Sequence, residues 1–231
     1  MNQILLSSKI PDSSRKLKII PEAVSYSDAE IRDKLLQLDK TCCVVKNGDA
    51  VGVCLEEDAD ESSSGTSMSL LAQTLPLKTT QLGDPEFIKV HGLKMAYMTG
   101  SMANGIASEN LVISSGKVGL LSSFGAAGLL PSRIEQAINI IQKALPDGPY
   151  AFNLIHSPSE DAIERAAVDL YLKYGVRTVE ASAFLGLTPN IVRYRVAGLR
   201  RSTQNKVEIT NRVIAKISRA EVASKFMAPA P

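Results

Sequence analysis

Residues 97–109 read Tyr97-Met-Thr-Gly-Ser-Met-Ala-Asn-Gly-Ile-Ala-Ser-Glu109, and this stretch decides the fold and locates the candidate site. A strand is expected over Met95–Thr99, and a helix is expected to begin at Ser108-Glu109. Small residues between a strand and a helix let backbone N–H groups approach a ligand closely. Taken alone, the stretch is more typical of a tight turn without a ligand, so the rest of the chain decides between the two.

The composition of the 231-residue chain is that of an ordinary globular protein, with 45% hydrophobic and 22% charged residues. A formal net charge of +2 gives no reason to expect a nucleic acid or a membrane as a partner. No apolar run approaches the roughly 20 residues that span a bilayer, and the first residues lack a signal-peptide pattern. The three cysteines have neither disulfide-framework nor metal-ligand spacing, so we expect a cytoplasmic protein without a metal.

The first 66 residues predict a small module of mixed secondary structure. Cys42–Lys46 and Ala50–Leu55 flank Asn47-Gly48-Asp49, and an Asn-Gly pair in that position is a strong signal for a β-hairpin. We expect a short amphipathic helix over Asp28–Asp39 to pack on this hairpin. The remaining expectations are a poorly ordered arm over residues 1–27, an acidic, serine-rich linker over Glu56–Ser64 and a connecting segment over residues 67–94.

From Met95 onward, candidate strands alternate with candidate helices, as in an α/β protein with a parallel sheet and right-handed crossovers. The candidate strands are Met95–Thr99, Val118–Phe124, Tyr150–Ile155, Arg177–Ala181 and Val213–Ile217. Amphipathic stripes predict helices over Ser132–Leu145 and Glu160–Tyr174. Further helix starts are predicted at Thr188-Pro189 and at the capping box Ser218-Arg-Ala-Glu221.

Residues 95–231 leave room for about five strand–helix units, whereas a complete eight-unit barrel takes about 250 residues. We therefore expect the N-terminal part of a TIM-type (β/α)8 barrel, preceded by the small α+β module. Sites on such barrels lie at the carboxyl ends of the strands, which is where Gly100–Ala103 would fall.

Four segments resemble the PfaD-type proteins that accompany polyunsaturated fatty acid and polyketide synthases. These segments are Ser101–Ser108, Phe124–Gly128, Gly148–Pro158 and Val179–Pro189. PfaD-type proteins are flavin-dependent enoyl reductases, related to nitronate monooxygenases. The resemblance implies a TIM barrel that holds FMN. It also implies NADH or NADPH as the reductant and acyl carrier domains as partners. The family's downstream Gly-Gly-His segment and late glycine-rich loops, which hold the flavin phosphate, have no counterpart in this sequence.

The resemblance also places the loop after the first candidate strand beside the flavin ring, although Met102 alone equally fits a core position. Asn153 offers an amide donor and acceptor for the pyrimidine edge or the ribityl chain. Lys216 would either favour reduced, anionic flavin or face a helix. A shift of strand phase by one residue would turn Glu180, Ser182 and Lys216 outward. The candidate cofactor-binding residues are Gly100, Ser101, Met102, Ala103, Asn153, Ser182 and Lys216.

No catalytic residue stands out from the sequence. His156 precedes Ser157-Pro158, and this context favours a structural or rim position in a loop over acid–base chemistry. The basic segment Arg193–Lys206 is typical of a solvated helix face, with docking of an acidic acyl carrier as the alternative.

Three hypotheses for the function follow. The first is an FMN-dependent enoyl reductase component that acts in trans on acyl-carrier-bound substrates, present as its N-terminal part. The second is a nitronate monooxygenase-like flavin oxidase on the same scaffold. The third is a non-catalytic half-barrel that requires a complementary chain.

Overall fold

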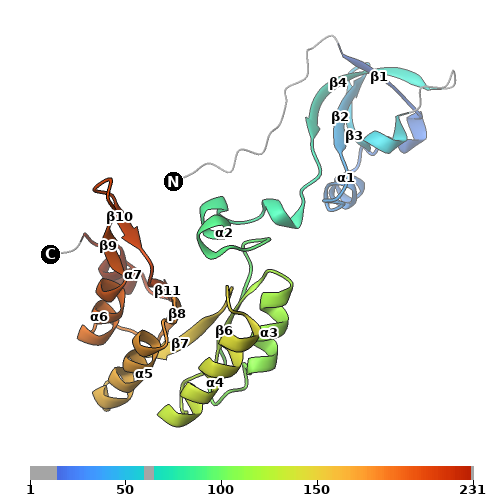
Figure 1. The fold of residues 1–231 in the computed structure, drawn as a ribbon. Helices are drawn as coiled ribbons and strands as arrows, with labels where there is room; N and C mark the ends of the chain where they lie inside the picture. The colour runs from blue at the N-terminus through green and yellow to red at the C-terminus, as the bar shows by residue number, and fades with distance from the viewer. Residues whose placement is uncertain (1–14, 60–64, 230–231) are drawn as a thin grey trace. The chain divides into compact units, whose positions relative to one another are not determined.

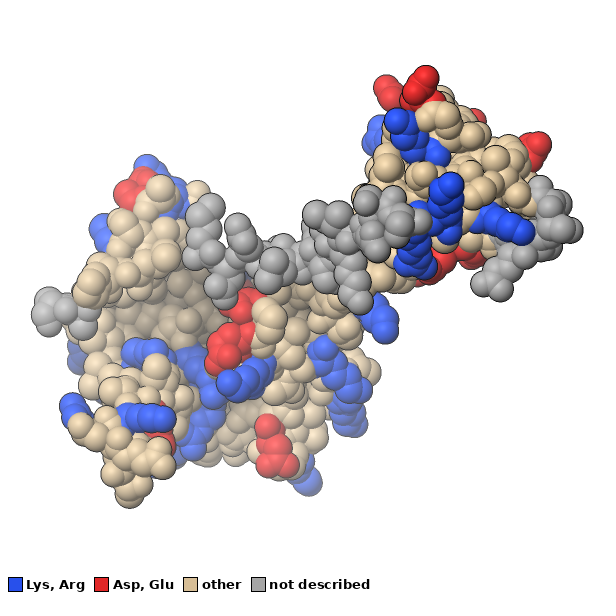
Figure 2. All heavy atoms as spheres, turned by 90° about the horizontal axis from the view of Figure 1, so that it is seen from above, with Lys and Arg blue, Asp and Glu red and all other residues tan. Residues whose placement is uncertain are grey.

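The computed structural model describes residues 15–59 and 65–229, which form two compact units divided between Leu82 and Gly83 (Figure 1). Within the described ranges, no helix is long and apolar enough to cross a membrane. Each unit has its own hydrophobic core. In the view of Figure 2, lysine and arginine side chains gather on the C-terminal unit, with few acidic side chains among them.

The N-terminal unit is a four-stranded antiparallel sheet in the order β1-β4-β2-β3. Its strands are β1 (Lys16–Ile19), β2 (Cys42–Asn47), β3 (Ala50–Leu55) and β4 (Thr66–Thr74). Helix α1 (Asp28–Leu35) contacts β3, and short 3-10 turns lie at Pro21–Ala23, Glu56–Asp58 and Thr79–Gln81. The predicted hairpin is confirmed, because β2 and β3 pair in register from Cys42↔Leu55 to Asn47↔Ala50.

Several expectations for this unit are wrong. Strand β4 pairs with both β1 and β2, so the sheet continues past residue 66 into the expected connecting segment. The expected arm over residues 1–27 contains β1, and its residues 1–14 lie outside the described residues. The helix ends at Leu35 rather than Asp39.

The acidic segment Glu56–Ser64 is partly folded rather than a linker throughout. Asp58 accepts a hydrogen bond from the backbone N–H of Leu55 at 2.9 Å and pairs with Lys34 at 3.2 Å. These contacts tie the beginning of the segment to β3 and α1, and residues 60–64 lie outside the described residues. The acidic and serine-rich composition therefore predicted a linker wrongly at this point, because the Asp58 carboxylate pairs with Lys34, which lies 24 residues earlier in the chain.

The C-terminal unit carries a parallel five-stranded sheet in the order β11-β8-β7-β6-β5. Its strands are β5 (Met98–Thr99), β6 (Leu121–Phe124), β7 (Ala151–Ile155), β8 (Thr178–Ser182) and β11 (Arg212–Ala215). The helices are α2 (Pro85–His91), α3 (Glu109–Lys117), α4 (Pro131–Ala144), α5 (Asp161–Lys173), α6 (Pro189–Ala197) and α7 (Ala220–Met227). This α/β arrangement with a curled parallel sheet fits a partial TIM-type barrel (Figure 1).

The main core lies between the sheet and helices α3–α6, which cover one of its faces (Figure 1). Buried aromatic rings of Phe124, Phe152 and Tyr171 meet there at centroid distances of 5.4–5.6 Å. On the opposite face, Leu121 and Ala151 pack with Leu93, at the N-terminal ends of the strands. This apolar layer lies on the face of the sheet that the helices do not cover.

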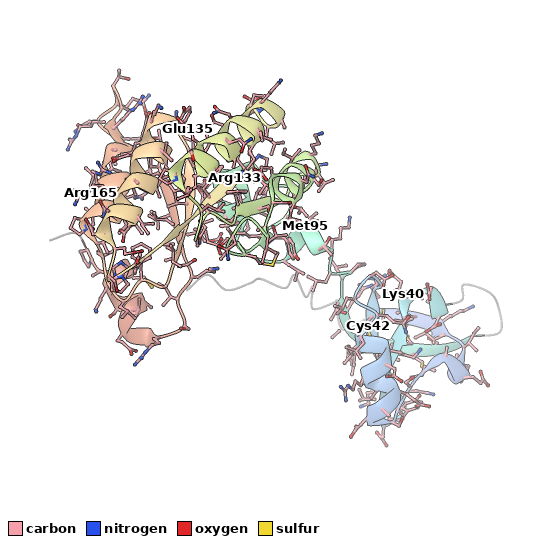
Figure 3. All side chains as sticks on the ribbon, turned by 90° about the horizontal axis from the view of Figure 1, so that it is seen from below. Lys40, Cys42, Met95, Arg133, Glu135 and Arg165 are labelled. Carbon is pink, nitrogen blue, oxygen red and sulfur yellow. The ribbon has the colours of Figure 1, made fainter. Side chains whose placement is uncertain are left out.

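Ion pairs tie neighbouring helices of this layer together. Arg133 and Glu135, labelled in Figure 3, both project from α4. Arg133 pairs with Glu109 at the start of α3 and lies 5.6 Å from the centre of the Phe124 ring. Glu135 accepts from Lys173 of α5 at 2.8 Å.

Helix starts were predicted better than strand and helix ends. Ser108 and Thr188 accept hydrogen bonds from the backbone N–H groups of Leu111 and Ile191, as N-caps do. The expected capping box at Ser218 is wrong, because the N-cap is Arg219 and no side chain caps it. Arg219 pairs with Glu221 instead.

The basic segment does not form one helix face. Helix α6 ends at Ala197, and the chain then forms an exposed antiparallel hairpin of β9 (Leu199–Arg201) and β10 (Val207–Ile209). Arg200 lies opposite Glu208 in this hairpin, so part of the basic charge faces an acidic neighbour.

Candidate functional site at the carboxyl ends of the parallel strands

The phase of the strands places two polar side chains on the face opposite the helices. Phe152, Val179 and Ala181 belong to the core under the helices. Since neighbouring residues in a strand point to opposite faces, Asn153 and Glu180 point away from that core. Both are almost fully buried, with exposed fractions of 4% and 1%.

Glu180 connects three parts of the chain. Its Oε2 accepts a hydrogen bond from the backbone N–H of Ser101 at 2.9 Å, and its Oε1 lies 2.8 Å from Lys216 Nζ. Burial alone would raise the pKa of Glu180, but Lys216 and the hydroxyl and N–H groups around the carboxylate outweigh it, and the pKa lies below its ordinary value of 4.5. The carboxylate is therefore ionised and holds the loop after β5 against β8.

Asn153 is oriented by its neighbours on β8. Its Nδ2 donates to the Glu180 carbonyl at 3.2 Å and to Ser182 Oγ at 2.8 Å, while Tyr171 donates to the Asn153 carbonyl at 2.6 Å. Both donor positions of the amide are thus used. Within the described part of the chain, Asn153 Oδ1 has no hydrogen-bond partner, so the side chain offers an acceptor and not the donor–acceptor pair expected from sequence.

The stretch at residues 97–109 is fixed to the loop that follows β6. Asn104 N–H donates to the Ala127 carbonyl at 2.8 Å, and Gly105 N–H donates to the Gly125 carbonyl at 2.9 Å. A Cβ atom on Gly125 would lie 1.7 Å from the Met102 carbonyl oxygen. Two of the segments that carry the family resemblance, Ser101–Ser108 and Phe124–Gly128, therefore form one packed unit.

The four candidate residues of the loop after β5, Gly100–Ala103, differ in solvent exposure. Gly100, Met102 and Ala103 are exposed, and Ser101 is partly buried. Met102 is 47% exposed, so it does not fill the core, which was the alternative left open by the sequence. A Cβ atom on Gly100 would meet only Glu180 Oε1, at 3.6 Å.

Ser123 was missed by sequence reasoning. It lies on β6 and is fully buried, and its Oγ is inaccessible to solvent and has no well-formed hydrogen bond among the described residues. The hydroxyl lies near enough to Glu180 to help lower the pKa of that carboxyl. Because this contact with Glu180 is not a well-formed hydrogen bond, the buried hydroxyl makes Ser123 a candidate ligand contact. The sequence around Ser123 does not indicate this role, because only the fold shows which of the adjacent residues Ser122 and Ser123 faces the sheet interior.

Lys216 lies one residue past the end of β11, not inside the strand as expected. Its backbone N–H donates to the Ala181 carbonyl at 2.9 Å, and its side chain remains 48% exposed while paired with Glu180. The structure thus turns Lys216 toward Glu180 rather than toward a helix. Because Glu180 balances its charge, Lys216 is not an isolated cation in this site.

His156 takes part in a separate contact set. Its Nδ1 lies 3.0 Å from Glu164 Oε2, its ring stacks on Phe184 at 5.3 Å, and its backbone N–H donates to the Ser182 carbonyl at 3.0 Å. Thr188, the N-cap of α6, donates to the other oxygen of Glu164. These contacts fit the structural position expected for His156, because they hold the loops after β7 and β8 together.

The carboxylate of Glu180 should stabilise the fold in a pH-dependent way. Since its folded pKa lies below the unfolded value, its contribution is present above pH 4.5 and is lost as pH falls through the folded pKa. We expect Glu180→Gln to lower the free energy of unfolding at pH 7 by about 1–3 kcal/mol, measured by urea denaturation.

The matched control is Glu221→Gln, which removes an exposed carboxylate from its pair with Arg219. An exposed ion pair contributes little, so this variant should unfold like the wild type. A gap between Glu180→Gln and the wild type that stays constant from pH 7 to pH 3 would contradict the role given to the ionised carboxylate.

Comparison with known proteins finds relatives of the chain, although no family model matches it. One polyunsaturated fatty acid synthase protein of Thraustochytrium is 41% identical over 231 residues, covering 97% of this chain and 15% of that protein. The polyketide biosynthesis protein PksE of Bacillus subtilis is 44% identical over 151 residues, covering 65% of this chain and 20% of that protein.

A solved structure resembles the chain as well. The crystal structure of the enoyl reductase domain of MlnA, from the macrolactin biosynthesis cluster of Bacillus amyloliquefaciens, matches with a TM-score of 0.64 and 39% identity. The match covers 67% of this chain and 35% of that one. The chain therefore spans only a minor part of each of these relatives.

The fold and the relatives together define an α/β protein with part of a TIM-type barrel, related to components of polyunsaturated fatty acid and polyketide synthases. The resemblance to PfaD-type enoyl reductases of these synthases is confirmed.

Proposed function

We propose that this chain forms the N-terminal, flavin-binding part of an FMN-dependent enoyl reductase that acts in trans on acyl-carrier-bound intermediates of a fatty acid or polyketide synthase. One observation carries the proposal. Glu180 organises a layer of polar groups at the carboxyl ends of parallel strands, in a chain that matches an enoyl reductase domain with 39% identity over 67% of its length. That end of the strands is where barrel enzymes place their sites.

The residues present fit a flavin. Among the described residues, the buried Ser123 hydroxyl has no well-formed hydrogen bond, and the amide oxygen of Asn153 on the next strand has no partner. The hydroxyl would donate to a carbonyl of the isoalloxazine, and the amide oxygen would accept from a ring N–H or a ribityl hydroxyl. When bound, FMN would supply hydride transfer from NADH or NADPH to the β-carbon of the enoyl group.

The loop at Gly100–Ala103 would form a wall of the flavin site. Because Gly100 lacks a side chain, a planar ring could approach its backbone closely. Met102 contributes an exposed, polarisable thioether on the same loop. Glu180 fixes this wall through Ser101 N–H, and its pairing with Lys216 keeps the charge of the site balanced before the flavin binds.

The acyl carrier would approach the C-terminal unit through complementary charge. Acyl carriers are acidic, and the surface of this unit in Figure 2 is rich in lysine and arginine. Arg200 and Arg201 lie on the exposed β9–β10 hairpin, which stands clear of the parallel sheet. This hairpin is our proposed docking element for the carrier.

A chimera tests the function. Residues 83–229 would replace the matching segment of the MlnA enoyl reductase domain, so that the remaining strands are supplied by that protein. We expect the chimera to bind FMN and to oxidise NADH or NADPH when given an enoyl thioester. Oxygen consumption with a nitroalkane, without turnover of the enoyl thioester, would support the nitronate monooxygenase alternative. A folded chimera without flavin would refute the cofactor assignment.

Asn153 provides the sharpest test of the flavin contacts in that chimera. We expect Asn153→Ala to weaken FMN binding by about 1–3 kcal/mol, because a buried polar partner is lost. His156→Ala should weaken binding far less, since His156 contacts Glu164 and Phe184 rather than the polar layer. Titration of flavin fluorescence on both variants gives the ranking. The reverse order would show that the functional end of β7 is wrongly assigned.

A further inference from the structure

A second polar cavity lies at the N-terminal ends of the strands, away from the candidate flavin site. Its volume is about 530 Å³, and it opens between the loops that precede β7, β8 and β11. Basic or hydroxyl-bearing side chains from several parts of the unit line it, among them His91, Tyr150, Arg177, Thr178 and Arg212. Asp147, which is exposed, is the one carboxylate among the lining residues.

The two arginines of this cavity lack the carboxylate partners that four other arginines of the unit have. Arg133, Arg165, Arg193 and Arg219 each pair with a carboxylate. Among the described residues, neither Arg177 nor Arg212 forms an ion pair or a side-chain hydrogen bond. Their backbones are adjacent, since Arg212 N–H donates to the Arg177 carbonyl at 2.8 Å. Arg177 directly precedes β8 and Arg212 begins β11. Two guanidinium groups therefore lie at the starts of neighbouring strands without a paired carboxylate among the described residues.

The other donors of the cavity are held in place by the fold. Gln142 donates to Tyr150 Oη at 2.9 Å and to the Tyr174 carbonyl at 2.8 Å, which leaves the Tyr150 O–H free to donate into the cavity. Thr178 is only 4% exposed, and its hydroxyl has no partner among the described residues. Burial and the charge of Arg212 lower the pKa of His91.

We propose that this cavity binds a small molecule through a phosphate group. Two planar guanidinium forks and two hydroxyl donors suit the several acceptor oxygens of a phosphate better than the two of a carboxylate. The volume falls in the range of small-molecule sites, and the walls are loops of one unit rather than a flat surface for a protein. The proposal does not depend on the flavin site, because it concerns the other end of the strands.

The binding of pyrophosphate to the full 231-residue chain tests this inference. Equilibrium dialysis with labelled pyrophosphate at constant ionic strength measures it directly and tolerates self-association of the protein. We expect saturable binding that Arg177→Gln and Arg212→Gln each weaken at least about tenfold. Arg32→Gln is the matched control, because this exposed arginine lies on α1 of the N-terminal unit and does not line the cavity.

Three outcomes decide the result. Loss of binding in both cavity variants with retention in Arg32→Gln supports the site. Competition by ADP or by pantetheine 4′-phosphate then separates a nucleotide from a carrier arm as the source of the phosphate. Absence of saturable binding overturns the proposal, and so does an equal loss in Arg32→Gln. Circular dichroism verifies the fold of each variant, and Arg177→Gln, at an exposed position, decides alone if Arg212→Gln does not fold.

Discussion

Gly125→Ala should destabilise the C-terminal unit by about 3 kcal/mol, a large effect for the addition of one methyl group. The added Cβ would lie 1.7 Å from the Met102 carbonyl oxygen, which is backbone and has no rotamer by which to move away. The loop would have to shift as a whole. It would then weaken the hydrogen bonds that Gly125 exchanges with Gly105 and Ala107, at 2.9 and 3.0 Å.

Gly100→Ala is the matched control on the same loop. Its added Cβ would meet only Glu180 Oε1 at 3.6 Å, an ordinary contact distance, so its stability should stay within about 1 kcal/mol of the wild type. Urea denaturation of both variants measures the difference. Equal stabilities would contradict the close packing of the two loops.

The 231-residue chain on its own is expected to bind FMN weakly or not at all and to self-associate. Five parallel strands do not close a barrel, so β5 and β11 are edge strands with unpaired backbone groups. Beside β11 lies a largely apolar groove of about 1150 Å³, formed with α6, α7 and the β9–β10 hairpin. Parallel sheets are normally covered on both faces, and an open edge next to such a groove promotes association.

Absorbance of the purified chain between 350 and 500 nm, NADH and NADPH oxidation with an enoyl thioester, and light scattering measure these properties. The MlnA chimera is the control, because it supplies further strands next to β11 while retaining residues 83–229. A yellow, active monomer of the 231-residue chain would contradict the argument from the open edge. It would show that five strands suffice to hold the cofactor.

Local patterns predicted the order of the elements in the C-terminal unit well. Apolar stripes located α4 and α5 within a residue of their observed ends, and Gly175 follows α5 with a positive φ of 64° as expected of a helix stop. Strand lengths were overestimated at β5 and β6, because Met95–Tyr97 and Val118–Leu120 are apolar but form bends and turns. Strand β4 was missed, since its pairing with β1 and β2 depends on residues distant in sequence.

The candidate site was predictable only in part. The resemblance to a family drew attention to Gly100–Ala103 and Asn153, and the structure places both at the same end of the sheet. The resemblance could not settle the phase of the strands. That phase decides that Glu180 faces the interior and that Ser123, unlike Ser122, has no well-formed hydrogen bond among the described residues. The pairing of Lys216 with Glu180 likewise required the register of β8 with β11.

The contact between Ser101 and Glu180 also has a consequence for the order of events during synthesis. The two residues are 79 positions apart, so the loop after β5 leaves the ribosome long before the carboxylate that holds it. Contacts of such separation form late, because the intervening chain must first be ordered. The hydrogen bond that fixes Ser101 in the wall at Gly100–Ala103 therefore forms only when β8 joins the sheet, whereas the contacts of the same loop with Gly125 and Ala127 need a much shorter stretch of chain.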